Sequence, residues 1–273
     1  GVDFSGGTSV TLQFEPQVGQ SQLRQEMADL GYESATIQGA GEGSYIIHIK
    51  EMTRPEVNAL AEELGQLLDS QVDVHDYYLA SPTVGLETAR NAGIAIAVAA
   101  VAMLLYIVWA FRRMPKPLRW GTCAIIALIH DVLIVLGVFS LLGHISGVEV
   151  NAMFITGVLT VVGYSINNTV VVFDRVRENI SKHLGADFGE MVNASLNETL
   201  GRSLNTGLTT LCVILAMLLF GGATIHSFVL VLLVGVLAGT YSSLGIAGPL
   251  LVVWEKGEWG QLLSRLRLSG KTA

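Results

Sequence analysis

The sequence has little charge and little cysteine. Only 14% of its 273 residues are Asp, Glu, Lys or Arg, whereas 51% are hydrophobic. Its two cysteines, Cys123 and Cys212, both lie in apolar runs, so they indicate no disulfide framework and no redox compartment. His48 and His75 lack partners at the spacing of a metal site, and we interpret them as partly buried polar residues. These absences exclude a disulfide-rich secreted scaffold and favour a membrane protein.

Long apolar segments confirm the membrane class. A helix needs roughly 20 apolar residues to cross about 30 Å of hydrocarbon. We find five such segments: residues 91–111, 121–142, 151–173, 204–220 and 228–254. The fold class is therefore a multi-span α-helical membrane protein, with a transmembrane bundle over residues 86–256 and a tail over residues 257–273.

The basic residues alternate between the connections. They lie in the first connection, the third connection and the tail: Arg112, Arg113, Lys116, Arg119, Arg175, Arg177, Lys182, Arg202, Lys256, Arg265, Arg267 and Lys271. Basic connections stay in the cytoplasm, so we expect a cytoplasmic C-terminus and an extracytoplasmic N-terminal region. There is no signal peptide, and the start at Gly1 looks internal, so we expect a sixth helix before it.

Residues 1–85 are predicted to form a small α+β domain. Strand patterns cover residues 8–14, 34–38, 45–49 and 72–79, and helix patterns cover residues 21–30 and 54–68. This β-α-β-β-α-β order is the ferredoxin-like arrangement. Residues 1–90 hold 14 acidic and 4 basic side chains, and the glycine-rich stretch 39–43 lies between strands, where a phosphate loop is not expected. The domain is interpreted as a docking surface.

Polar residues inside the spans mark the candidate functional positions, because each one costs free energy there. His130 and Asp131 lie near the middle of the second span, about 100° apart on the helix, so they need not be partners. In the third span, a polar stripe repeats every four residues and ends at Asn168. Its members are Thr156, Thr160, Tyr164 and Asn168.

The last two spans carry further polar or small residues. The fourth begins with Arg202, Asn205 and Thr209 at i, i+3, i+7 spacing. The fifth carries a close-packing face of small residues, which are Gly235, Gly239, Ser242 and Ser243. The simpler interpretation is that hydroxyls and amides bond neighbouring helices and that Arg202 reaches the headgroups. Residues 187–200 are predicted as a separate amphipathic helix on the inner membrane surface.

The motifs resemble those of the SecF family. GVDFSGGT at residues 1–8, IHDVLI at 129–134, GYSINNTVVVFDRVREN at 163–179 and NETLGRSLNT at 197–206 carry the resemblance over essentially the whole chain. It implies a six-helix subunit of the bacterial inner membrane, related to proton-driven transporters, that works with SecD or forms half of a fused SecDF chain. The implied partners are SecD, the Sec translocon channel, unfolded preprotein and membrane lipids, with no nucleic acid.

The resemblance also implies a proton pathway, with protons as the coupling ion, no cofactor and no enzymatic reaction. The resemblance points to Asn168, Asp131, His130 and Arg202. Asn205 and Thr160, which are polar residues of the spans, complete the candidate pathway. The family pattern has an aspartate where this chain has Asn168, and an amide carries no proton near neutral pH. Because the rest of the motif is intact, an engineered isosteric Asp→Asn change is favoured over natural divergence.

We therefore expect an auxiliary membrane component of Sec-dependent export that folds and assembles but conducts protons poorly. Two alternatives stay open. One is a small-molecule or lipid exporter of the same superfamily, although a domain this small offers little room for a drug pocket. The other is a non-transporting assembly partner, for which the polar stripe would serve only to hold helices together.

Overall fold

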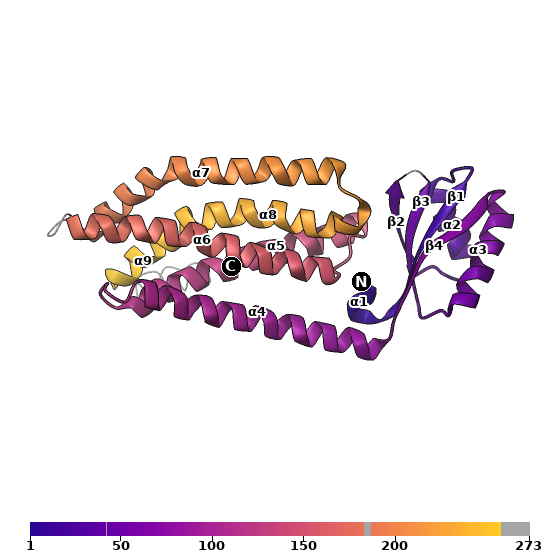
Figure 1. Ribbon diagram of the computed structural model, residues 1–273, viewed down its shortest axis with the longest axis horizontal. Coiled ribbons are helices and arrows are strands. Elements are labelled where there is room, and N and C mark those ends of the chain that lie inside the picture. Colours follow the sequence, from indigo (N-terminus) through magenta and orange to yellow (C-terminus); the bar gives the residue numbers. More distant parts are fainter. Residues whose placement is uncertain (42, 183–186, 258–273) are drawn as a thin grey trace, which may run out of the picture. The chain divides into compact units, whose positions relative to one another are not determined.

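The computed structural model describes residues 1–41, 43–182 and 187–257 (Figure 1). These residues form two compact units. The first contains Gly1–Ala95, Phe139–Thr156 and Leu218–Val229, and the second contains Ile96–Val138, Gly157–Met217 and the described residues from Leu230 onward.

The N-terminal residues form a four-stranded antiparallel sheet. In chain order its elements are α1 (Val2–Ser5), β1 (Gly7–Glu15), α2 (Gln20–Asp29), β2 (Thr36–Gly41), β3 (Ser44–Ile49), α3 (Arg54–Leu68) and β4 (Gln71–Ala80). The strand order is β2-β3-β1-β4. The helices α2 and α3 cover one face of the sheet (Figure 1). This confirms the predicted ferredoxin-like fold.

Local sequence explains these elements. Val10, Leu12 and Phe14 alternate along β1 and are all buried, since one face of the strand packs on the helices. Helix α3 begins with a capping box, in which the Thr53 and Glu56 side chains satisfy backbone N–H groups at the helix start. The capping box therefore fixes the residue at which α3 begins.

Five helices among the described residues have the length and apolar composition to cross a membrane. They are α4 (Pro82–Ala110), α5 (Pro117–Ser146), α6 (Ala152–Lys182), α7 (Phe188–Phe220) and a fifth that runs from His226 to Glu255. Together with the sheet they confirm the predicted fold class of a multi-span helical membrane protein with an N-terminal α+β domain. These helices are longer than the predicted apolar spans, because backbone hydrogen bonding sets the length of a helix and apolarity alone does not.

The prediction of a separate amphipathic helix over residues 187–200 was wrong. Helix α7 runs without a break from Phe188 to Phe220, and Val192 is buried in the core of the second unit instead of lying on a membrane surface. The sequence offers only Gly201 as a breaker at this point. A single glycine costs about 1 kcal/mol in a helix, too little to end one that packs on its neighbours.

The fifth span is not one regular helix. Helix α8 (His226–Ser242) continues into a π-helical turn at Ser243–Ala247 and then into α9 (Gly248–Glu255). Pro249 lacks the N–H that would bond one turn back, and its ring would collide with that carbonyl, so the backbone widens just before it. The turn follows directly after Ser242, which is part of the site described below.

The small residues predicted to form a close-packing face do so. A methyl group at Gly235 would overlap a methyl group of Val161 on α6, and one at Gly239 would lie 3.2 Å from Ser165. Helices approach this closely only where side chains are absent. The contact holds α8 against the α6 segment that carries the polar stripe.

We expect Gly235→Ala to destabilise the protein by about 1–3 kcal/mol, because the new methyl group overlaps Val161 and forces α6 and α8 apart. Gly163→Ala is the matched control, since a methyl group there meets nothing within 4 Å. Thermal unfolding of the purified protein in detergent measures both variants. Equal midpoints for the two variants would contradict the packing argument.

In the first unit, the connection between α5 and α6 contacts the sheet domain. His48 Nδ1 lies 2.5 Å from Glu149 Oε2, and Gln38 Nε2 donates to the Gly147 carbonyl at 3.3 Å. His48 therefore has a carboxylate partner far along the chain. Burial acts to raise the pKa of Glu149, but the hydrogen bond and charge of His48 and a hydrogen bond from Thr36 outweigh it, so this pKa lies below its usual value.

Candidate functional site

Asp131 is the buried carboxylate of the second unit. It lies in the middle of α5, and its side chain has no exposed surface. Two hydroxyl groups donate to the same oxygen, Oδ2: Ser165 of α6 at 2.5 Å and Ser242 of α8 at 2.7 Å. Three helices thus converge on one carboxyl group. Because a buried carboxylate needs hydrogen bonds or a proton, these hydroxyls make its burial tolerable.

His130 contacts the other carboxyl oxygen. Its Nδ1 lies 3.1 Å from Asp131 Oδ1, and the imidazole side chain is about one-third exposed. Helix geometry did not require the two residues to be partners, but the structure shows that they are in contact. A partly exposed imidazole joined to a buried carboxyl group is an arrangement that can pass a proton between the surface and the core.

Asn168 lies one turn beyond Ser165 on α6, about 4.5 Å further along the axis and on the same side of the helix. It is only 4% exposed. Among the described residues its Nδ2 is the single buried side-chain nitrogen or oxygen without a hydrogen-bond partner. Most buried polar groups are satisfied, so this amide is badly matched to its surroundings.

The rest of the polar stripe leaves the core. Tyr164 is half-buried, with its hydroxyl 3.4 Å from Thr240 Oγ1, whereas Thr156 and Thr160 are exposed on α6. Thr160 and Tyr164 line a groove of about 460 Å³ together with Thr209 and Thr210 of α7. Two members of the stripe, Thr160 and Tyr164, therefore line an open groove, whereas Asn168 lies buried outside it.

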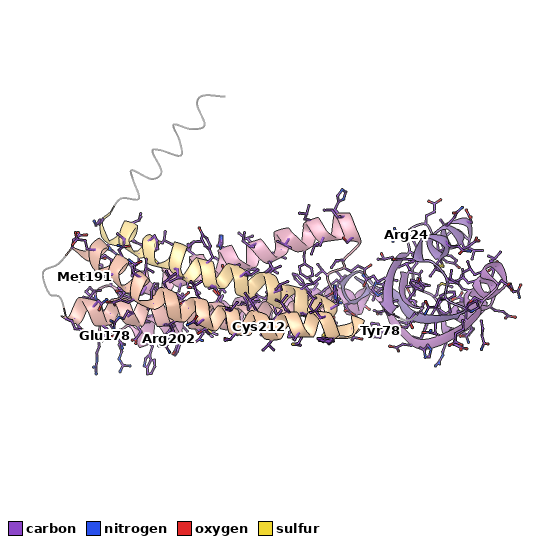
Figure 2. All side chains as sticks on the ribbon, turned by 90° about the horizontal axis from the view of Figure 1, so that it is seen from above. Arg24, Tyr78, Glu178, Met191, Arg202 and Cys212 are labelled. Carbon is purple, nitrogen blue, oxygen red and sulfur yellow. The ribbon has the colours of Figure 1, made fainter. Side chains whose placement is uncertain are left out.

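Arg202 and Asn205 are exposed on α7, and each lines a surface groove instead of the Asp131 site. Arg202 is exposed and lines a small cleft of about 240 Å³ whose acidic members are Asp174, Glu178 and Glu198. Figure 2 shows Arg202 and Glu178 at the same edge of the bundle. Asn205 lines a separate, mostly apolar groove of about 660 Å³ between α7 and α8. Of the six predicted residues, Asp131 and Asn168 are buried and His130 is partly exposed. The other three, Arg202, Asn205 and Thr160, are exposed.

Sequence reasoning did not identify Ser165 and Ser242 as the partners of Asp131. Ser165 was visible in the polar run before Asn168, and Ser242 in the small-residue face of the last span. No spacing rule links residues 111 positions apart, as Asp131 and Ser242 are. Only the packing of α5, α6 and α8 shows that these hydroxyls share one carboxyl oxygen.

The arrangement defines a class of protein: a multi-pass membrane protein with an ionisable group buried between its helices. The C-terminal model of the protein export membrane proteins SecD/SecF matches residues 60–257, and the SecD/SecF GG motif matches residues 1–18. The chain belongs to the SecD/SecF family.

Relatives of two kinds are similar to this chain. The protein translocase subunit SecF of Thermobaculum terrenum is 42% identical over 97% of this chain and 87% of its own length. The protein translocase subunit SecDF of Bacillus subtilis is 35% identical over 94% of this chain. The crystal structure of SecDF from Thermus thermophilus, titled a translocon-associated membrane protein, matches 93% of this chain with a TM-score of 0.81 and 36% identity. This chain spans 34% of each SecDF chain.

Proposed function

We propose that this chain is the SecF component of a SecDF assembly, which uses proton flow across the membrane to assist preprotein export. The observation that carries the proposal is the fully buried Asp131, held by Ser165 and Ser242 one helix turn from Asn168. Ionisable residues buried between membrane helices, facing the interior of the bundle, commonly mark proton or ion routes.

Asn168 is proposed as the position where the proton-carrying carboxyl group of the family stands. Asn168 Nδ2 finds no hydrogen-bond acceptor among the described residues, and the position is buried, so a carboxyl group there is more stable neutral than charged. It would ionise when water arrives, through the groove next to Thr160 or the cleft next to Arg202. The amide of Asn168 keeps the shape of that carboxyl group but cannot take up or release a proton.

The proposed location is the bacterial inner membrane, with the sheet domain outside and the C-terminus in the cytoplasm. The support is the concentration of Lys and Arg in alternate connections and the acidic balance of residues 1–90. In this orientation the sheet domain faces preprotein that has left the Sec channel. The proposed partners are therefore SecD, the channel and the emerging preprotein.

Assembly tests the proposal. The chain is expressed with SecD and the Sec channel in bacteria that lack their own SecF, and the complex is purified through SecD. We expect this chain to co-purify with SecD, because Asn168 leaves the bundle intact, and to give only weak proton-gradient-dependent export. Failure to associate with SecD would contradict the proposal. Full export that is insensitive to a protonophore would show that proton flow is not part of the proposed function.

A further inference from the structure

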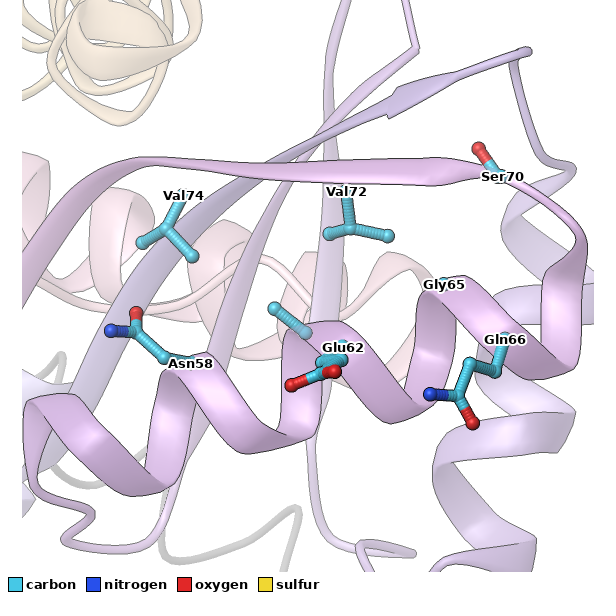
Figure 3. Close-up of a pocket in the computed structure, with 8 residues that line it drawn as sticks. Asn58, Glu62, Gly65, Gln66, Ser70, Val72 and Val74 are labelled. Carbon is cyan, nitrogen blue, oxygen red and sulfur yellow. The ribbon is translucent and has the colours of Figure 1, made fainter.

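A groove runs along the outer edge of the sheet domain, between α3 and β4 (Figure 3). Its volume is about 420 Å³. Asn58, Glu62 and Gln66 line it from the helix, and Val72 and Val74 line it from the strand. Figure 3 shows the two valine side chains pointing toward the helix and the three polar side chains along the helix surface.

The two walls have matching lengths. Asn58, Glu62 and Gln66 recur every four residues, so they form one stripe that spans about 12 Å of helix. The strand wall from Ser70 to Val74 spans about 13 Å. Ala61 and Gly65 also line the groove, and at Gly65 the helix approaches the strand segment closely, since a Cβ there would lie 2.9 Å from the Ser70 carbonyl oxygen. The space thus accepts roughly four residues of extended chain.

The strand wall is also the edge of the sheet. β4 stands at one end of the order β2-β3-β1-β4 and pairs with β1 on one side only. Beyond Val74 the register with β1 shifts, and the Tyr77 N–H is bonded to the Asp76 carboxylate at 2.9 Å. The part of the edge that stays regular is therefore the part that lines the groove. Such an edge offers backbone N–H and C=O groups to another extended chain.

The acidic charge around the groove favours a basic peptide segment. Residues 54–80 contain six acidic side chains and one arginine. Glu62 lines the groove, is exposed, and takes part in none of the ion pairs formed within the described residues. Asn58 and Gln66 can both donate and accept hydrogen bonds, so they suit many side chains. A basic residue of the bound segment would lie next to Glu62.

We propose that this groove binds an extended, unfolded polypeptide segment, which adds as a strand to the outer edge of β4 and places a Lys or Arg beside Glu62. Backbone hydrogen bonds supply the binding, so the site tolerates many sequences, while Glu62 favours basic ones. The identification of this segment with translocating preprotein rests on the proposed function.

A peptide-binding experiment tests the groove. The probe is a short fluorescent peptide of alternating Val and Thr with a central Lys, and the full chain is purified in detergent. Binding is followed by fluorescence anisotropy. We expect Glu62→Lys to weaken binding about three- to tenfold, because it replaces an attraction by a repulsion. Glu63→Lys is the matched control, since Glu63 is an exposed neighbour that does not line the groove, and it should change binding less than about twofold.

The same peptide with alternate backbone nitrogens methylated tests strand addition. Methylation removes the N–H donors without changing the charge, and we expect binding to weaken about tenfold or more. Equal effects of the Glu62 and Glu63 variants, or unchanged binding of the methylated peptide, would overturn the proposal.

Photocrosslinking during export separates this proposal from the proposed function. A benzoylphenylalanine at position 66 in the groove should crosslink preprotein, whereas the same group at position 25 on the exposed side of α2 should not. If the chain stimulates export but shows neither the crosslink at position 66 nor Glu62-dependent peptide binding, the groove proposal is wrong and the proposed function remains. Glu62-dependent peptide binding supports the groove even where export is not stimulated.

Discussion

Asn168→Asp is expected to raise proton-gradient-dependent export by about tenfold or more, because it restores a group that can take up and release a proton at a buried position one helix turn from Ser165, which bonds Asp131. The exchange is isosteric, so the bundle should accept it without repacking. The measurement is the amount of preprotein exported by membrane vesicles that contain this chain and SecD, with the proton gradient intact and after a protonophore.

The control for this prediction is Asn167→Asp. Asn167 is the preceding residue on α6, carries the same side chain and is exposed, so the same change adds the same charge outside the buried cluster. We expect no gain in gradient-dependent export from this control. Equal export by the original chain and by Asn168→Asp would remove residue 168 from the mechanism.

Asp131→Asn, made together with Asn168→Asp, is expected to abolish at least about nine-tenths of the restored gradient-dependent export. The amide oxygen can still accept a hydrogen bond from Ser165 or Ser242, so the three helices remain held together, but the position no longer binds a proton. Thermal unfolding in detergent is measured beside export, so that a loss of function is distinguished from a loss of the fold.

Asp187→Asn serves as its control. Asp187 precedes α7, is exposed and pairs with Lys256 at 3.2 Å, and it does not line the cleft next to Arg202. Exposed ion pairs contribute about 0–1 kcal/mol, and we expect less than a twofold change in export. If Asp131→Asn left gradient-dependent export intact, the buried carboxyl group would be structural, and the assembly-partner interpretation would replace the proposed mechanism.

The fold was largely predictable because its signals are local. Alternating Val10, Leu12 and Phe14 indicate a strand with one buried face, and runs of roughly 20 apolar residues indicate spanning helices. Helix ends were predicted less well. Residues 187–200 looked like a separate amphipathic helix, yet the chain continues through Gly201 into the span because neighbouring helices stabilise both parts.

The site was only partly predictable. Asp131 and Asn168 could be identified from the sequence, because ionisable and amide side chains are rare in apolar spans. The π-helical turn after Ser242 could not, since Pro249 predicts a disturbance but not its form. Arg202 and Asn205 share the polar character of the cluster but are exposed in surface grooves beside α7.

The sequence by itself determined the membrane class, the alternation of basic connections, the ferredoxin-like domain and the family, because composition, periodicity and motif order are properties of the chain alone. The tertiary structure decided which hydroxyls hold Asp131, that Asn168 Nδ2 has no partner, and that α3 and β4 enclose a groove. Each of these is a contact or a gap between segments distant in the chain, and only the packing of helices and strands creates it.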